Sequence, residues 1–160
     1  MPITAKIEGM TEISEALTKL AEEAPKAAAA GLYEGAGVMA GAIQKGVDGI
    51  RTVPFKYAAH GDTRQPSPEE KAALAGAVGI AKFDRNGAEI NTSIGFGNAG
   101  YADVAGHERA IAQVANAINS GTSFMQKQPF FRKAATKGTK EAEKAIINEI
   151  EKRVNALTPK

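Results

Sequence analysis

The feature that most constrains the fold is the segment Gly121–Ala135, which precedes the longest amphipathic pattern of the chain. It opens with a Gly-Thr pair suited to a turn, and it continues through a bulky bridge to Pro129, a residue favoured in the first turn of a helix. We therefore predict a short strand before this segment and a C-terminal helix from about residue 129. The apolar stripe of that helix is formed by Ala142, Ile146, Ile150, Val154 and Leu157.

A second helical region is predicted near the N-terminus. Residues 2–8 alternate like a half-buried strand, and Thr11 then suits the N-cap of an amphipathic helix. Pro25 is expected to break or restart this helix, because proline has no amide hydrogen to donate and fits best in a first turn. The next helix is predicted from about Lys26 to about Asp48.

Glycine is unusually frequent within this second predicted helix. The positions are Gly31, Gly35, Gly37, Gly41 and Gly46. Each glycine costs about 0.5–1 kcal/mol relative to alanine in a helix interior. The expected compensation is close backbone approach by a neighbouring element, either of the same chain or of another copy. A kinked or frayed helix is the alternative.

A long loop is predicted at about residues 50–66, and such loops are either functional or disordered. A short helix follows and is expected to reach about Val78. Its start is well defined, because Ser67 can act as N-cap, Pro68 occupies the first helical position, and Glu70 can close a capping box.

The most secure local prediction is a β-hairpin, with Gly79–Asp84 as one strand, Asn86-Gly87 as the turn and Ala88–Phe96 as the returning strand. For Tyr101–Asn119 we expect a helix to about Gln113 followed by a short strand. The chain is thus predicted to be a single α+β domain over residues 1–160. Its small antiparallel sheet, with the central hairpin, would be packed by two long helices and shorter helices.

Composition argues against several classes of protein. The chain has no cysteine and two histidines, and its net charge of +2 is too small to indicate a nucleic-acid-binding protein by itself. Neither a signal peptide nor a membrane span is expected. The G-x-G-x-x-G match from Gly95 to Gly100 follows a hairpin strand rather than a βαβ unit, so we interpret it as a turn. His60 and His107 lack partners at metal-ligand spacing. No cofactor, metal or enzymatic activity is expected.

Basic and aromatic residues are interleaved in the long loop and around the start of the last helix. The candidate residues for an oligomer or partner interface are Arg51, Lys56, Arg64, Phe124, Phe130, Phe131 and Arg132. A face that stacks nucleic-acid bases is conceivable from this pattern. The preferred interpretation is that the aromatic residues are packing anchors and the basic residues form a solvated rim.

The order of elements resembles the tail-component family of long-tailed bacteriophages, the neck or tail-completion proteins at the head–tail junction. The matching residues are Gly121, Thr122, Pro129, Phe130, Arg132 and Ala134 or Ala135. The opening from Ile7 to Ile13 is similar to that family's short strand, glycine and first amphipathic helix. Two regions depart from the family pattern, namely Thr63–Leu74 and Ala117–Ser120.

The resemblance implies a structural virion protein, made in the host cytoplasm and located at the head–tail junction. It implies a homo-oligomeric ring of six or twelve copies that contacts neighbouring connector and tail proteins. DNA would pass through its channel without sequence-specific binding, and no membrane would be involved. A tail terminator or minor tail protein is the alternative, and a small nucleic-acid-binding domain is an alternative from another class.

Overall fold

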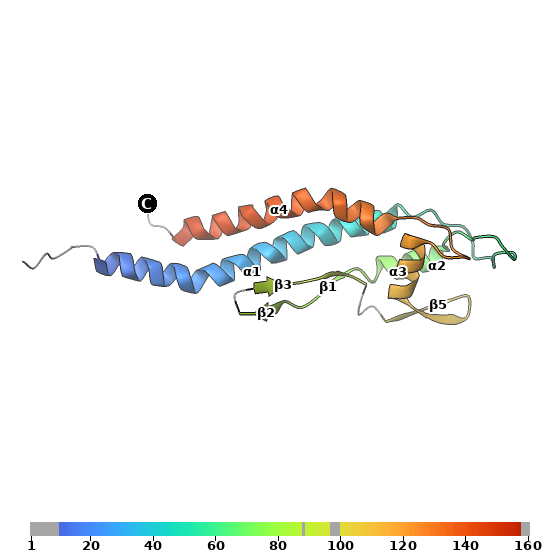
Figure 1. Cartoon of the computed structure of the whole chain (residues 1–160), viewed down its shortest axis with the longest axis horizontal. Helices are drawn as coiled ribbons and strands as arrows, with labels where there is room; N and C mark the ends of the chain where they lie inside the picture. The colour runs from blue at the N-terminus through green and yellow to red at the C-terminus, as the bar shows by residue number, and fades with distance from the viewer. Residues whose placement is uncertain (1–9, 88, 97–99, 158–160) are drawn as a thin grey trace, which may run out of the picture.

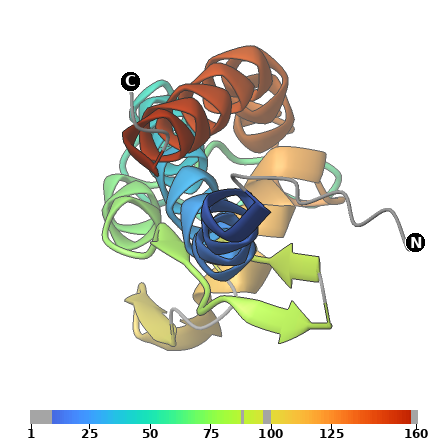
Figure 2. The same ribbon diagram turned by 90° about the vertical axis from the view of Figure 1, so that its left-hand side faces the viewer.

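The computed structural model describes residues 10–87, 89–96 and 100–157. The molecule is elongated, and two long helices, α1 (Met10–Asp48) and α4 (Phe130–Leu157), lie side by side along its length (Figure 1). They run antiparallel, since Gly31 of α1 lies against Ile150 and Gly46 lies against Phe130. Viewed along the long axis, α1 lies between α4 and the β-hairpins (Figure 2). The predicted α+β class and the C-terminal helix are confirmed.

Two short helices and six short strands are the other regular elements among the described residues. The helices are α2 (Pro68–Ala75) and α3 (Ile111–Ser120). The strands form three separate two-stranded antiparallel ladders, which are β1 (Gly79–Ile80) with β4 (Ile94–Gly95), β2 (Asp84–Asn86) with β3 (Glu89–Asn91), and β5 (Tyr101–Val104) with β6 (His107–Ala110).

The first two ladders are successive parts of the predicted hairpin. Asn86 pairs with Glu89, so Asn86 belongs to β2 rather than to the predicted turn. Ala88, the expected first residue of the returning strand, lies outside the described residues. The predicted first strand is interrupted, because Ala81–Phe83 belongs to neither ladder.

The glycines of α1 fall into two groups. A Cβ atom added to Gly31 would lie 2.7 Å from Ile150 Cγ1 and 2.9 Å from the carbonyl oxygen of Ile146. Gly35 and Gly46 meet α4 in the same way, so the expected close backbone approach is confirmed and the neighbour belongs to the same chain. An added Cβ at Gly37 or Gly41 would have no atom within 4 Å. One edge of α1 is therefore packed and another is open.

The predicted break at Pro25 is wrong, because α1 continues through it. Pro25 is exposed, so a carbonyl that loses its helical hydrogen bond can be hydrated, and the helix can bend without ending. Figure 1 shows such a bend in the blue part of α1. Thr11, expected to cap the helix, lies within it, and the strand predicted for residues 2–8 lies outside the described residues.

The prediction for Tyr101–Asn119 is also wrong. The first half forms the β5–β6 hairpin, whose turn places Ala105 and Gly106 at φ 54° and φ 80°. The carboxylate of Asp103 accepts a hydrogen bond from the Gly106 amide at 2.8 Å and stabilises this turn. The helical spacing of the apolar residues is real, but it belongs to α3, so the element before Gly121 is a helix rather than a strand.

The main core lies where the C-terminal half of α1 and the first turns of α4 meet α2 and α3. Its fully or nearly fully buried members include Ile43, Val47, Leu74, Ile118 and Met125. Among the residues that the structure describes, no helix has both the length and the apolar character needed to cross a membrane.

Candidate functional site

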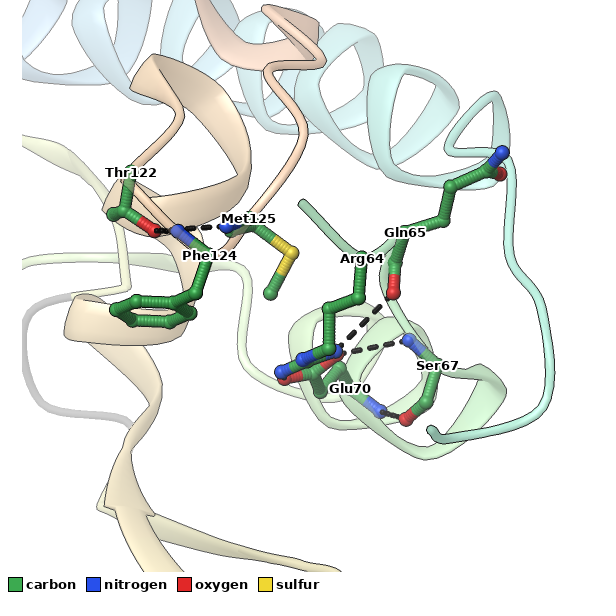
Figure 3. Close-up of polar contacts among 7 residues, drawn as sticks. All are labelled: Arg64, Gln65, Ser67, Glu70, Thr122, Phe124 and Met125. Atoms are coloured by element: carbon green, nitrogen blue, oxygen red, sulfur yellow. Dashed lines mark hydrogen bonds and ion pairs between the residues drawn. The ribbon is translucent and has the colours of Figure 1, made fainter. Parts of the chain in front are cut away.

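The long loop after α1 ends in a buried ion pair. Arg64 Nη1 lies 2.7 Å from Glu70 Oε2, and Arg64 Nη2 lies 2.5 Å from Glu70 Oε1 (Figure 3). The predicted capping box is confirmed, since Ser67 N donates to Glu70 Oε2 at 2.8 Å and Glu70 N donates to Ser67 Oγ at 3.3 Å. The Glu70 carboxylate therefore holds both the end of the loop and the start of α2.

The backbone of Arg64 joins the loop to the segment before α4. Arg64 N donates to Phe124 O at 2.9 Å, and Gln126 N donates to Arg64 O at 2.8 Å. The guanidinium also lies 4.8 Å from the centre of the Phe55 ring, within the range of a cation–π contact. Arg64, expected at an interface, is thus an internal anchor that a partner cannot reach.

The Gln128 side chain holds residue 51 at the beginning of the loop. The Gln128 side chain accepts a hydrogen bond from Arg51 N at 2.9 Å and donates one to Arg51 O, also at 2.9 Å. In this way the amide group of Gln128 bonds the backbone of residue 51 as a neighbouring strand would. Both ends of the predicted loop at 50–66 are therefore hydrogen-bonded to the segment that precedes α4.

Arg51 and Gln128 line an open groove of about 960 Å³ between α1 and the start of α4. The floor contains small residues, including Ala42, Ala134 and Gly138. Five cationic side chains and one carboxylate line the groove. They are Lys45, Arg51, Lys127, Lys133, Lys137 and Glu141.

The other predicted interface residues are dispersed. Phe130 is buried and Phe131 is half-buried, and both rings pack on Phe96, with centroid distances of 6.0 Å and 6.2 Å. They are packing anchors, as preferred from the sequence. Phe124 is 45% exposed.

Two further candidates, Lys56 and Arg132, are exposed but do not line the groove. Of the seven candidates, the groove includes Arg51 and, at its floor, Phe130.

Lys45 and Lys127 are not among the predicted interface residues, and the fold brings them to the groove together with Gly41. A signal was present in α4, where Lys133 and Lys137 lie one turn apart and each is followed by a small residue. That repeat places cations along the rim of a shallow surface on which another backbone can approach.

Residues with potential for catalysis do not converge. His60 and His107 are exposed, and His107 Nε2 lies 3.4 Å from the Tyr57 hydroxyl. Within residues 10–87, 89–96 and 100–157, no group of three acidic or histidine side chains is arranged to hold a metal ion. Gly100 precedes strand β5 rather than a helix, contrary to what a dinucleotide-binding glycine motif requires.

The groove is an open cationic surface with a floor of small residues, and this arrangement suits a polyanion or an acidic helix. Comparisons with family models, curated proteins and solved structures found no match for this chain.

Proposed function

We propose that this chain is a structural virion protein of a tailed bacteriophage, a subunit of the neck or tail-completion ring that joins head to tail and surrounds the DNA channel. The proposal starts from the resemblance carried by Gly121–Ala135. It is supported by the start of α4 at Phe130, where the Pro-Phe-Phe element of that resemblance lies. One expected element differs, because α3 replaces the strand before Gly121. A tail terminator or minor tail protein is the alternative within the same class.

The observation that carries the proposal is a pair of unlike surfaces at opposite ends of an elongated molecule. The first turns of α1 expose Ile13, Leu17 and Leu20, whereas the basic groove lies at the far end of α1. Subunits of a cyclic assembly meet through two different surfaces, so each copy must carry both. A long, two-ended subunit of this kind suits a ring.

A small nucleic-acid-binding domain is the second candidate, and the cations of the groove favour it. Lys and Arg side chains bind phosphates whatever the sequence, and such binding weakens steeply with salt. The two functions differ in what the isolated protein does: a ring subunit associates with itself, whereas a nucleic-acid-binding domain binds DNA as a monomer.

The test is size-exclusion chromatography with light scattering, followed by negative-stain electron microscopy and a duplex-DNA shift assay. We expect closed rings of six or twelve copies with a central channel. A strict monomer that shifts duplex DNA at physiological salt would contradict the ring and support the second candidate.

A further inference from the structure

We infer that the first turns of α1 of one copy dock into the basic groove of the next copy. We call residues 10–24 the arm. Neither the arm nor the groove is covered by a described part of its own chain. The inference rests on the proposed function, because the contact between arm and groove would hold neighbouring subunits of the proposed ring together.

The arm carries an apolar face without a partner among the described residues. Ile13, Leu17 and Leu20 follow one another at spacings of four and three, so they lie on one side of the helix. Their exposed fractions are 57%, 61% and 39%. The arm projects beyond the C-terminal end of α4 (Figure 1), which leaves this face uncovered. Helices that bind in a groove of a partner have an apolar stripe of this kind, which is exposed to water before they bind.

The charge of the arm is opposite to that of the groove. Residues 10–24 contain four glutamates and one lysine, and one of the glutamates, Glu23, is bound to Lys26 at 2.7 Å. The groove has five cations and one carboxylate. Two arms placed side by side would bring like charges together, whereas an arm in the groove brings opposite charges together. Electrostatics therefore selects the groove over a second arm.

The surface of the groove accepts a helix backbone. Its floor includes the small residues Ala42, Ala134 and Gly138, and Gly41, which also lines the groove, has no atom within 4 Å of an added Cβ. Small residues allow two helices to approach closely, and the leucine side chains of the arm can then reach the floor. The lysines of the rim remain free to face the glutamates of the incoming arm.

The occupant must belong to another copy. Leu17 and Gly41 lie in the same helix, 24 residues apart, which corresponds to about 36 Å along the axis. An arm cannot fold back onto its own groove while α1 stays helical. The contact is head-to-tail, and repetition of such a contact either closes a ring or extends a filament.

Cross-linking tests the contact directly, because the chain has no cysteine of its own. Leu17→Cys and Gly41→Cys are made in separate chains of different mass, mixed, and treated with a short bismaleimide. The matched control replaces Leu17→Cys with Ile147→Cys, which is 54% exposed on α4. We expect the 17–41 product to exceed the 147–41 product by about tenfold, because docking raises the effective concentration of the two thiols. A 17–41 yield no greater than the control, or a dominant 17–17 product, overturns the inference.

Two variants test the arm and the groove independently. Leu17→Glu disables the arm, and Lys133→Glu with Lys137→Glu disables the groove; all three side chains are exposed, so the thermal midpoint of the monomer should not change. Each variant alone should remain monomeric. An equal mixture should form dimers and stop there, since one intact arm and one intact groove remain. Monomers in the mixture, or wild-type association by either variant, overturn the inference.

The same samples distinguish this contact from the proposed function. Closed rings without the 17–41 product would support the proposed ring and overturn the contact between arm and groove. Open filaments that give the 17–41 product, without closed rings, would support the contact between arm and groove and contradict the proposed ring. If the groove variant loses binding to a duplex DNA oligonucleotide but associates like the wild type, the groove is a DNA site and the inference fails.

Discussion

Arg64 and Glu70 meet inside the protein as a two-point ion pair, with nitrogen–oxygen distances of 2.7 Å and 2.5 Å. The pair lies six residues apart in sequence, yet it connects the loop after α1, the start of α2 and, through the backbone of Arg64, the segment before α4. A single carboxylate is therefore the meeting point of three parts of the fold.

Glu70→Ala is expected to lower the free energy of unfolding by about 3–5 kcal/mol, because it leaves the buried Arg64 guanidinium without its anion. Urea unfolding followed by circular dichroism measures the loss. Glu69→Ala is the matched control, since Glu69 is the neighbouring carboxylate and is exposed. Similar losses in the two variants would show that the buried pair does not matter.

Gly31→Ala and Gly37→Ala should have opposite effects on stability. The new methyl group at Gly31 would lie 2.9 Å from the Ile146 carbonyl oxygen, and overpacking of this kind costs about 1–3 kcal/mol. The methyl group at Gly37 meets nothing within 4 Å, so the variant should gain about 0.5–1 kcal/mol from the better helix former. Thermal unfolding of both variants checks the sign, and a stabilised Gly31→Ala would contradict the tight helix pair.

Phe130→Ala should destabilise the protein by about 3–5 kcal/mol, because it removes a buried ring that packs on Phe96 and Phe131. Phe124→Ala provides the comparison, since that ring is 45% exposed. Its loss should be much smaller. Denaturant midpoints that change equally would mean that the start of α4 is not anchored through Phe130.

Pro25→Ala should stabilise the arm rather than the core. Proline in a helix interior costs about 3 kcal/mol relative to alanine, and Pro25 is exposed, so no packing is lost by its removal. Hydrogen exchange of the amides of residues 13–24 should slow, while exchange near Val47 should not. Unchanged exchange in the arm would show that the bend at Pro25 does not weaken the helix.

Local patterns predicted much of the fold. Ser67, Pro68 and Glu70 specify the start of α2 through contacts within one turn, and the sequence contains all the information that such a cap needs. The start of α4 follows from Pro129, and the extent of α1 to Asp48 follows from apolar periodicity. Close approach was expected at the glycines of α1, and it holds at Gly31, Gly35 and Gly46 but not at Gly37 or Gly41.

The errors arose where distant residues or unusual turns decide the structure. Ala105 adopts a positive φ, which alanine rarely does, so the turn between β5 and β6 was not recognised although Asp103 and Gly106 are typical turn residues. The partner of Arg51 is Gln128, 77 residues away, and no local pattern indicates that contact. The groove was missed for the same reason, since its cations come from α1, the loop and α4.

The pairing of α1 with α4 has a consequence for how the protein folds during synthesis. Gly31 packs on Ile150, so the two halves of the longest helical contact come from opposite ends of the chain. At translation rates of about 5–20 residues per second, α4 follows α1 by roughly 5–20 seconds. During that delay the packed edge of α1 is exposed to water, and formation of the helix pair must also close a very long loop. The contact between α1 and α4 is therefore among the last to form.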